Sequence, residues 1–213
     1  MVFEKARKRM VAQLDRRGVR DARVLGAMAS VPREAFVSAG TEDFAYADSP
    51  LPIGEGQTIS QPYIVAAMAE AAELEPVGRV LEVGAGSGYA AAIFSQLAGQ
   101  VFAIERHASL TEAARERCHT LGYHNIAFKT GDGSVGWPEE ALFDAILVAA
   151  GVPKPPEALK RQLKIGGRLI VPVGETNEQR LLRIRRKGEG KFQEDDLGGV
   201  RFVPLIGAQG WPE

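Results

Sequence analysis

A glycine-rich turn and an acidic residue in front of it are the part of this sequence best suited to bind a ligand. The stretch VLEVGAGSGYAAA has the pattern of a strand, a turn and a helix, with Gly84, Gly86 and Gly88 in the turn. Glycines at this spacing let the backbone approach a ligand closely at the N-terminus of a helix. Glu82 precedes them and suits a cationic amino-acid group better than a pyrophosphate. Tyr89 stands where a dinucleotide fingerprint requires glycine, which disfavours NAD.

Two further carboxylates follow the next two predicted strands. Glu105 ends the strand VFAIE, where it can accept hydrogen bonds from both hydroxyls of a ribose. Asp132 follows the third strand, in TGDGS, where it can accept a hydrogen bond from an adenine amino group. The carboxyl ends of parallel strands meet at the edge where open α/β sheets bind ligands. Together the carboxylates predict a nucleoside with a cationic tail and no phosphates, and S-adenosylmethionine fits best.

The stretch GEGQTISQPYIVAAMAE, residues 54–70, places polar side chains at the start of a predicted helix. A serine before a helix with Pro62 in its first turn is a common helix cap, so the residues alone favour capping for Ser60. Thr58 is equally compatible with a plain loop role. The alternative is that these side chains face a substrate.

The surrounding elements alternate between strands and helices. Helical spacing predicts helices over 3–15, 20–29 and 62–74, with an irregular, functional loop over 40–60. Continuously apolar strands between helices indicate a parallel sheet covered on both faces. The stretches RLLRIRR and VRFVPL predict two late strands in an antiparallel addition. We therefore expect an α/β, doubly wound, mostly parallel seven-stranded Rossmann-like sheet with an N-terminal helical cap.

Composition narrows the class of protein further. The chain has 213 residues, 45% of them hydrophobic, a net charge of −1 and one cysteine. These values predict one compact domain overall, with a helical region and active-site loop over 1–75 and a cofactor-binding core over 76–213. They favour a cytoplasmic protein that binds neither nucleic acid nor membrane. Cys118 lies on an apolar helix face and is expected to pack, and the histidines lack metal-ligand spacing, so we expect no metal.

Several longer stretches carry a resemblance to a known family. GQTISQPYIVAAM, VLEVGAGSGYAAA, AIER, GDGSVGW, FDAILVAA, GGRLIVPVG and FVPLIGAQGW cover nearly the whole chain. With them the chain resembles the protein-L-isoaspartate O-methyltransferases. The glycine motif is shared with methyltransferases at large, whereas GQTISQPY and FVPL are specific to this family. The resemblance implies a methyltransferase sheet with its last two strands exchanged in order.

The resemblance also implies an activity and its residues. The family uses S-adenosyl-L-methionine, releasing S-adenosyl-L-homocysteine, to methylate the α-carboxylate of isoaspartyl residues in damaged proteins and peptides, which starts repair to aspartate. It places Ser60 as the catalytic residue near the substrate carboxylate, and this favours a site over a cap. The implied substrate-binding residues are Thr58, Ile59, Ser60, Val203, Pro204 and Leu205. The implied cofactor-binding residues are Gln61, Pro62, Tyr63, Glu82, Gly84, Gly86, Ser87, Gly88, Glu105, Arg106, Asp132 and Gly133.

One position departs from the family pattern. Some relatives have a polar side chain after VPL, whereas this chain has Ile206, so a cofactor contact there requires the backbone. We expect a monomer with isoaspartyl proteins and peptides as its substrates. The alternatives are a methyltransferase of the same fold for another carboxylate or small molecule, and a non-catalytic nucleotide-binding module. An NAD oxidoreductase fits least.

Overall fold

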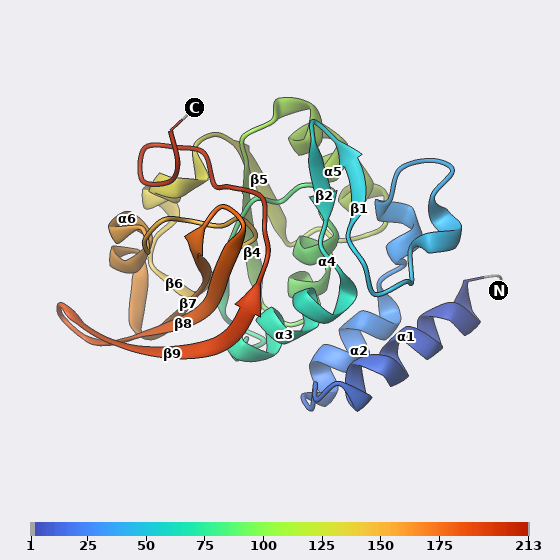
Figure 1. Ribbon diagram of the computed structural model, residues 1–213, viewed down its shortest axis with the longest axis horizontal. Helices are drawn as coiled ribbons and strands as arrows, with labels where there is room; N and C mark the ends of the chain where they lie inside the picture. The colour runs from blue at the N-terminus through green and yellow to red at the C-terminus, as the bar shows by residue number, and fades with distance from the viewer. Residues whose placement is uncertain (1–2, 213) are drawn as a thin grey trace.

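A seven-stranded sheet forms the centre of the protein in the computed structural model, which describes residues 3–212 (Figure 1). Its strand order is β5-β4-β3-β6-β7-β8-β9. The first five strands of this order are parallel, and β8 and β9 add to β7 in antiparallel fashion. The strands are β3 (Arg79–Val83), β4 (Gln100–Glu105), β5 (Ile126–Thr130), β6 (Phe143–Val148), β7 (Leu163–Glu175), β8 (Glu178–Gly188) and β9 (Lys191–Val200). The expected doubly wound, mostly parallel sheet is confirmed. Its last three strands, β7, β8 and β9, lie side by side in the order in which they occur in the chain.

Residues of the central strands alternate between two apolar cores. Val80 and Leu147 belong to the core on one face, whereas Leu81 and Ile146 belong to the core on the other. This explains the continuously apolar strands, because a strand buried on both faces has no solvent side. Helices α1 (Glu4–Arg16), α2 (Ala22–Ser30), α3 (Pro62–Ala72), α4 (Tyr89–Ser95) and α5 (Ala108–Thr120) pack on the first core, and α6 (Glu157–Arg161) packs on the second.

The C-terminal strands differ from the prediction. VRFVPL is not the last strand, because β9 ends at Val200. β9 is an edge strand whose residues are all exposed or partly exposed, so it needs no apolar run. Cross-strand pairs such as Arg183–Asp195 stabilise it. Residues 201–205 instead leave the sheet and bind Gly151, which donates to the Val203 carbonyl and accepts from the Leu205 N–H, both at 2.8 Å.

The loop expected over 40–60 is also more ordered than predicted. It contains a short 3-10 helix (Glu42–Phe44) and a hairpin of β1 (Leu51–Gly54) and β2 (Gln57–Ile59). The hairpin turns through Gly54, Glu55 and Gly56, which all have positive φ. QTI is therefore a strand, and the chain enters α3 directly after it. The division at residue 75 stays a prediction, and one core cluster joins residues from both sides of it.

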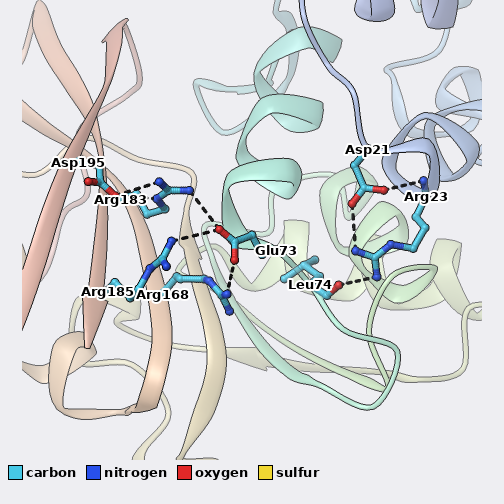
Figure 2. A network of polar contacts seen from close by, with 8 residues as sticks. All are labelled: Asp21, Arg23, Glu73, Leu74, Arg168, Arg183, Arg185 and Asp195. Carbon is cyan, nitrogen blue, oxygen red and sulfur yellow. Dashed lines mark hydrogen bonds and ion pairs between the residues drawn. The ribbon is translucent and has the colours of Figure 1, made fainter. Parts of the chain in front are cut away.

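An ionic cluster fixes the far end of α3 to the sheet (Figure 2). Glu73, in the left-handed conformation after the helix, pairs with Arg168 of β7 and with Arg183 and Arg185 of β8. Arg183 also pairs with Asp195 of β9. Because α3 starts at the predicted substrate loop, this cluster holds the helix that carries the loop. None of the helices within residues 3–212 has the length and apolar character of a membrane span.

Candidate active site

A pocket at the carboxyl edge of the sheet gathers most of the predicted site residues. The glycine turn after β3, the end of β4 and hairpin residues form its walls, together with the segment after β9. The predicted residues that line it are Thr58, Ile59, Ser60, Glu82, Gly84, Gly86, Ser87, Glu105, Arg106, Gly133, Val203, Pro204 and Leu205. The structure thus brings the predicted substrate loop and the predicted cofactor turn to the same pocket.

The glycine turn needs glycine for its backbone shape. Gly84 has φ +87° and Gly86 has φ +52°, both in the left-handed region. A side-chain carbon on Gly86 would lie 3.1 Å from the Ile53 Cδ1 atom. Gly88 is the N-cap of α4, and a side chain there would meet Ala114 and Cys118 instead of the pocket. Gly88 therefore lets α4 pack against α5, and the other two glycines keep the pocket wall thin.

Glu105 holds this turn in place with both of its carboxylate oxygens. Oε2 accepts the Gly86 N–H at 2.9 Å, and Oε1 accepts the His107 N–H at 3.0 Å. The side chain is buried, yet it lines the pocket. Each oxygen keeps a second lone pair, so Glu105 can still accept hydrogen bonds from a ribose. The sequence indicated the ribose role but not the bonds to the turn.

Glu82 is a buried carboxylate with an incomplete set of partners. Only 1% of it is exposed, and within residues 3–212 its Oε2 atom has no hydrogen-bond partner. Burial, and after it the negative charge of Glu105, raise the pKa of Glu82 well above its usual range. A cation in the pocket would reverse this, because it favours the ionised carboxylate. The donor set therefore fits a ligand with a positively charged amino-acid end.

Ser60 lies between β2 and α3 with its side chain unengaged. The N-cap of α3 is Gln61, and no side chain caps the helix, so the capping alternative for Ser60 is not what the structure shows. The Ser60 hydroxyl makes no hydrogen bond within residues 3–212. Its main-chain carbonyl accepts a 2.8 Å hydrogen bond from Arg33. The hydroxyl is thus free to bind a substrate while its backbone is fixed.

A second groove opens beside this pocket. The two share Thr58, Ser60, Ala149, Val203 and Pro204. From these residues the groove runs on to the β7–β8 turn, residues 176–177, to the start of β8 and to the end of β9. Gln61, predicted to contact the cofactor, lines this groove and not the pocket. Ser60 therefore lies where the pocket and the groove meet.

Two other predicted cofactor residues lie away from the pocket lining. Pro62 is buried in the first turn of α3. The Tyr63 N–H donates to Asp48 at 3.0 Å, and its ring lies 3.6 Å from the Arg17 guanidinium carbon. Both residues orient the start of α3, so a direct cofactor contact for them stays a prediction.

Asp132 lies in a separate depression with Arg106 and Ile206. Its carboxylate accepts hydrogen bonds from the Ser134 N–H and hydroxyl at 2.8 and 2.7 Å, and from the Ala208 N–H at 2.8 Å. Burial alone would raise the pKa of Asp132, but these hydrogen bonds hold it below its usual range. Asp132 thus fastens the C-terminal segment over the sheet edge, and its adenine contact stays a prediction.

Other lining residues were not predicted as site residues. They include Gln57, Val65, Tyr89 and Ile206. Tyr89 carried a signal, since it follows the glycine motif directly, and Ile206 follows VPL. Val65 is one turn into α3 and looks like an ordinary core residue in the sequence.

Two further residue predictions concern reactivity and metals. Cys118 is 1% exposed, and burial raises the pKa of its thiol to about 12, so it packs as expected. Within residues 3–212 no group of three or more His, Cys, Asp and Glu side chains is arranged to hold a metal ion.

The sheet order, the glycine turn and the carboxylate-lined pocket define an S-adenosylmethionine-dependent methyltransferase of the Rossmann-like class. A more specific match comes from sequence. The profile of the protein-L-isoaspartate(D-aspartate) O-methyltransferase family matches residues 5–210. The chain belongs to this family.

Individual relatives agree with this assignment. The protein-L-isoaspartate O-methyltransferase of Brucella anthropi is 58% identical over 212 residues, which cover 99% of this chain and 98% of that protein. A solved protein-L-isoaspartate O-methyltransferase matches with a TM-score of 0.87 and 32% identity, over 96% of this chain and 67% of the other. A Plasmodium falciparum structure, described as a putative member in complex with S-adenosyl-L-homocysteine, matches with a TM-score of 0.81 and 29% identity, over 93% and 97%.

Proposed function

We propose that this chain uses S-adenosyl-L-methionine to methylate the α-carboxylate of L-isoaspartyl residues in damaged proteins and peptides, which initiates their repair to aspartate. The observation that carries the proposal is the position of Ser60. Its free hydroxyl lies where the carboxylate-lined pocket meets the open groove. A cofactor in the pocket and a peptide in the groove would meet at this residue.

Different residues of the pocket would bind different parts of the cofactor. Glu82, with its unpartnered oxygen, would hold the cationic amino-acid end, and Glu105 the ribose hydroxyls. Gly84, Gly86, Ser87, Arg106 and Gly133 would line the remaining surface, with Asp132 at the adenine edge. When bound, the cofactor supplies a methyl group that its sulfonium has already activated.

The protein then has to position the substrate and exclude water. A carboxylate is ionised at neutral pH and needs no general base. Ser60 would donate a hydrogen bond to it, while Thr58, Ile59 and residues 203–205 would hold the neighbouring peptide. Bringing the carboxylate oxygen in line with the methyl group at about 3 Å supplies the main rate gain. The ester product then collapses through a succinimide toward normal aspartate.

We extend the proposal to the setting in which the enzyme works. Its substrates are isoaspartyl proteins and peptides, and we infer a monomer that acts in the cytoplasm. The inference about the compartment is supported by the free, buried Cys118, since the chain has no other cysteine with which to form a disulfide.

Methyl transfer from labelled cofactor to two matched peptides tests the proposal. The peptides have one sequence and differ only in an isoaspartyl or an aspartyl linkage. This change moves the carboxylate by one methylene relative to the backbone, so the aspartyl peptide loses the in-line geometry. We expect strong labelling of the isoaspartyl peptide alone. Equal labelling, or labelling of neither, would contradict it and favour another methyl acceptor.

A further inference from the structure

Arg33 is a buried cation directly behind the substrate loop. Its side chain is 0% exposed, and within residues 3–212 it has no ion-pair partner. Burial lowers the pKa of Arg33, but a guanidinium stays protonated at neutral pH. Burying a charge without a direct ion pair is costly, and the negative charge of Asp48 attracts the guanidinium from beyond ion-pair distance.

The contacts of Arg33 connect the substrate loop to the cofactor pocket. Nη2 donates to the Ser60 carbonyl at 2.8 Å, and Nε donates to the Ala45 carbonyl at 2.6 Å. The guanidinium carbon lies 4.7 Å from the centre of the Tyr89 ring, which lines the cofactor pocket. Within the described residues Nη1 has no hydrogen-bond partner. Arg33 thus fixes the Ser60 backbone relative to α4 and keeps spare positive charge.

The geometry of one peptide group transmits this contact to the groove. In a trans peptide the C=O and N–H point in opposite directions. Since the Ser60 carbonyl points to Arg33, the Gln61 N–H points away from it. That N–H donates no hydrogen bond within residues 3–212, and Gln61 lines the open groove. A hydrogen bond to the carbonyl of such a group also strengthens its N–H as a donor.

The buried charges have opposite signs on the two sides of the site. Among residues 3–212 the buried charged side chains are Arg33, Glu82 and Glu105. The two carboxylates line the cofactor pocket, whereas the arginine lies behind Ser60. Each sign is opposite to that of the ligand proposed for its side, a cationic cofactor and an anionic carboxylate.

We propose that Arg33 is a positioning residue for the substrate carboxylate. It holds and polarises the Ser60–Gln61 peptide group, so that the Gln61 N–H and the Ser60 hydroxyl together receive the anion. Its positive charge offsets the repulsion that Glu82 and Glu105 exert on that anion. This inference rests on the proposed function and assigns to Arg33 the selectivity for an ionised carboxylate.

A pair of peptides that differ in charge tests the proposal. One contains an isoaspartyl residue with its free α-carboxylate, and the other has a carboxamide at that position. Their affinities for wild-type protein saturated with S-adenosyl-L-homocysteine are measured by calorimetry. General damage to the loop lowers the affinity for both peptides alike. Loss of the Arg33 charge lowers the affinity only for the peptide with the carboxylate.

Three variants complete the experiment. Arg33→Met should reduce the preference for carboxylate over carboxamide about 10-fold, the scale of a hydrogen bond to a charged group, with cofactor-product affinity within about threefold. Arg33→Lys keeps the charge without the fork and should retain the preference while kcat falls about 10-fold. Arg23→Met is the control, since Arg23 donates to the Leu74 carbonyl at 2.9 Å (Figure 2) and lines neither the pocket nor the groove.

The outcomes separate this inference from the function on which it rests. A folded Arg33→Met protein with wild-type preference would overturn it. If that variant does not fold, an Arg33→Lys protein that has lost the preference would overturn it instead. If the wild type methylates the isoaspartyl peptide and Arg33→Met binds both peptides with wild-type affinity, the role of Arg33 is contradicted but the proposed function is not. A wild type that neither methylates nor prefers the carboxylate contradicts the proposed function itself.

Discussion

The cofactor side and the substrate side of this site use their buried residues in different ways. On the cofactor side, Glu82 and Glu105 are carboxylates near the carboxyl ends of adjacent strands, and they line the pocket themselves. On the substrate side, the buried charge of Arg33 acts through the backbone of Ser60. The first side presents charged atoms to its ligand, whereas the second presents a hydroxyl and a peptide group.

The difference follows from the two ligands. A cofactor has one shape and one charge, so fixed carboxylates can match it. A damaged peptide varies in sequence, and only its carboxylate and backbone are constant, so backbone and hydroxyl donors suit it better. The comparison leads to predictions that can be tested by substituting one residue at a time.

Glu82→Gln should have the largest effect on cofactor binding. Removing one partner of a buried charge pair costs about 3–5 kcal/mol, so affinity for S-adenosyl-L-homocysteine should fall roughly 100- to 4,000-fold. Calorimetry measures this loss directly. Affinity within threefold of the wild type would remove Glu82 from the cation-binding role.

The same variant should bind the cofactor less tightly and yet raise the stability of the unliganded protein. Because the pKa of Glu82 is raised in the folded state, the folded protein binds more protons than the unfolded chain above the usual glutamate pKa. The stability contributed by protonated Glu82 is complete below that value and is lost as pH rises through the folded pKa. The unliganded Glu82→Gln protein should therefore melt higher than the wild type, by a margin that grows with pH. A lower melting temperature at pH 8 would contradict the raised pKa.

Glu105→Gln should weaken the cofactor less and destabilise the fold. The amide offers one oxygen, so the Gly86 or the His107 N–H loses its acceptor. Affinity should fall about 10- to 150-fold, and the melting temperature by about 2–10 °C. Thermal melts of both glutamate variants at one pH give the comparison. Equal shifts of the same sign would remove the distinction between a ligand-binding and a turn-holding carboxylate.

Ser60→Ala should affect the substrate side alone. It removes one hydrogen bond to a charged group, so single-turnover methyl transfer should fall about 10- to 150-fold. Affinity for the cofactor product should stay within about threefold, because the cofactor is held by the buried carboxylates and not by Ser60. An equal loss in both measurements would mean that the two sides are not separate.

The cofactor side was the easier one to predict from sequence. Gly84, Gly86, Glu82 and Glu105 lie in or next to local strand–turn patterns, and parallel strands bring their ends together. The bond from Glu105 to the turn could not be predicted, because it depends on the register between β3 and β4.

The substrate side depends on contacts between distant parts of the chain. Arg33 lies in VPREAFV, where an arginine has the appearance of a solvated residue, and its bond to Ser60 spans 27 positions. The contacts of Tyr63 with Arg17 and Asp48 are likewise between positions that are distant in the sequence. The end of β9 was misplaced because an edge strand can be polar on both faces. None of these features leaves a periodic signal in the sequence.

The pH dependence of single-turnover methyl transfer, with cofactor saturating, tests most directly whether the substrate side positions a carboxylate without a base. Wild type and Ser60→Ala are compared on the same isoaspartyl peptide from pH 4 to 9. The account predicts a rate that falls only in acid, as the substrate carboxyl protonates near its free pKa of about 3.5, with parallel profiles for the two proteins. An ascending limb near pH 7 in the wild type that vanishes in Ser60→Ala would contradict it, because it would make Ser60 part of a proton-transfer system.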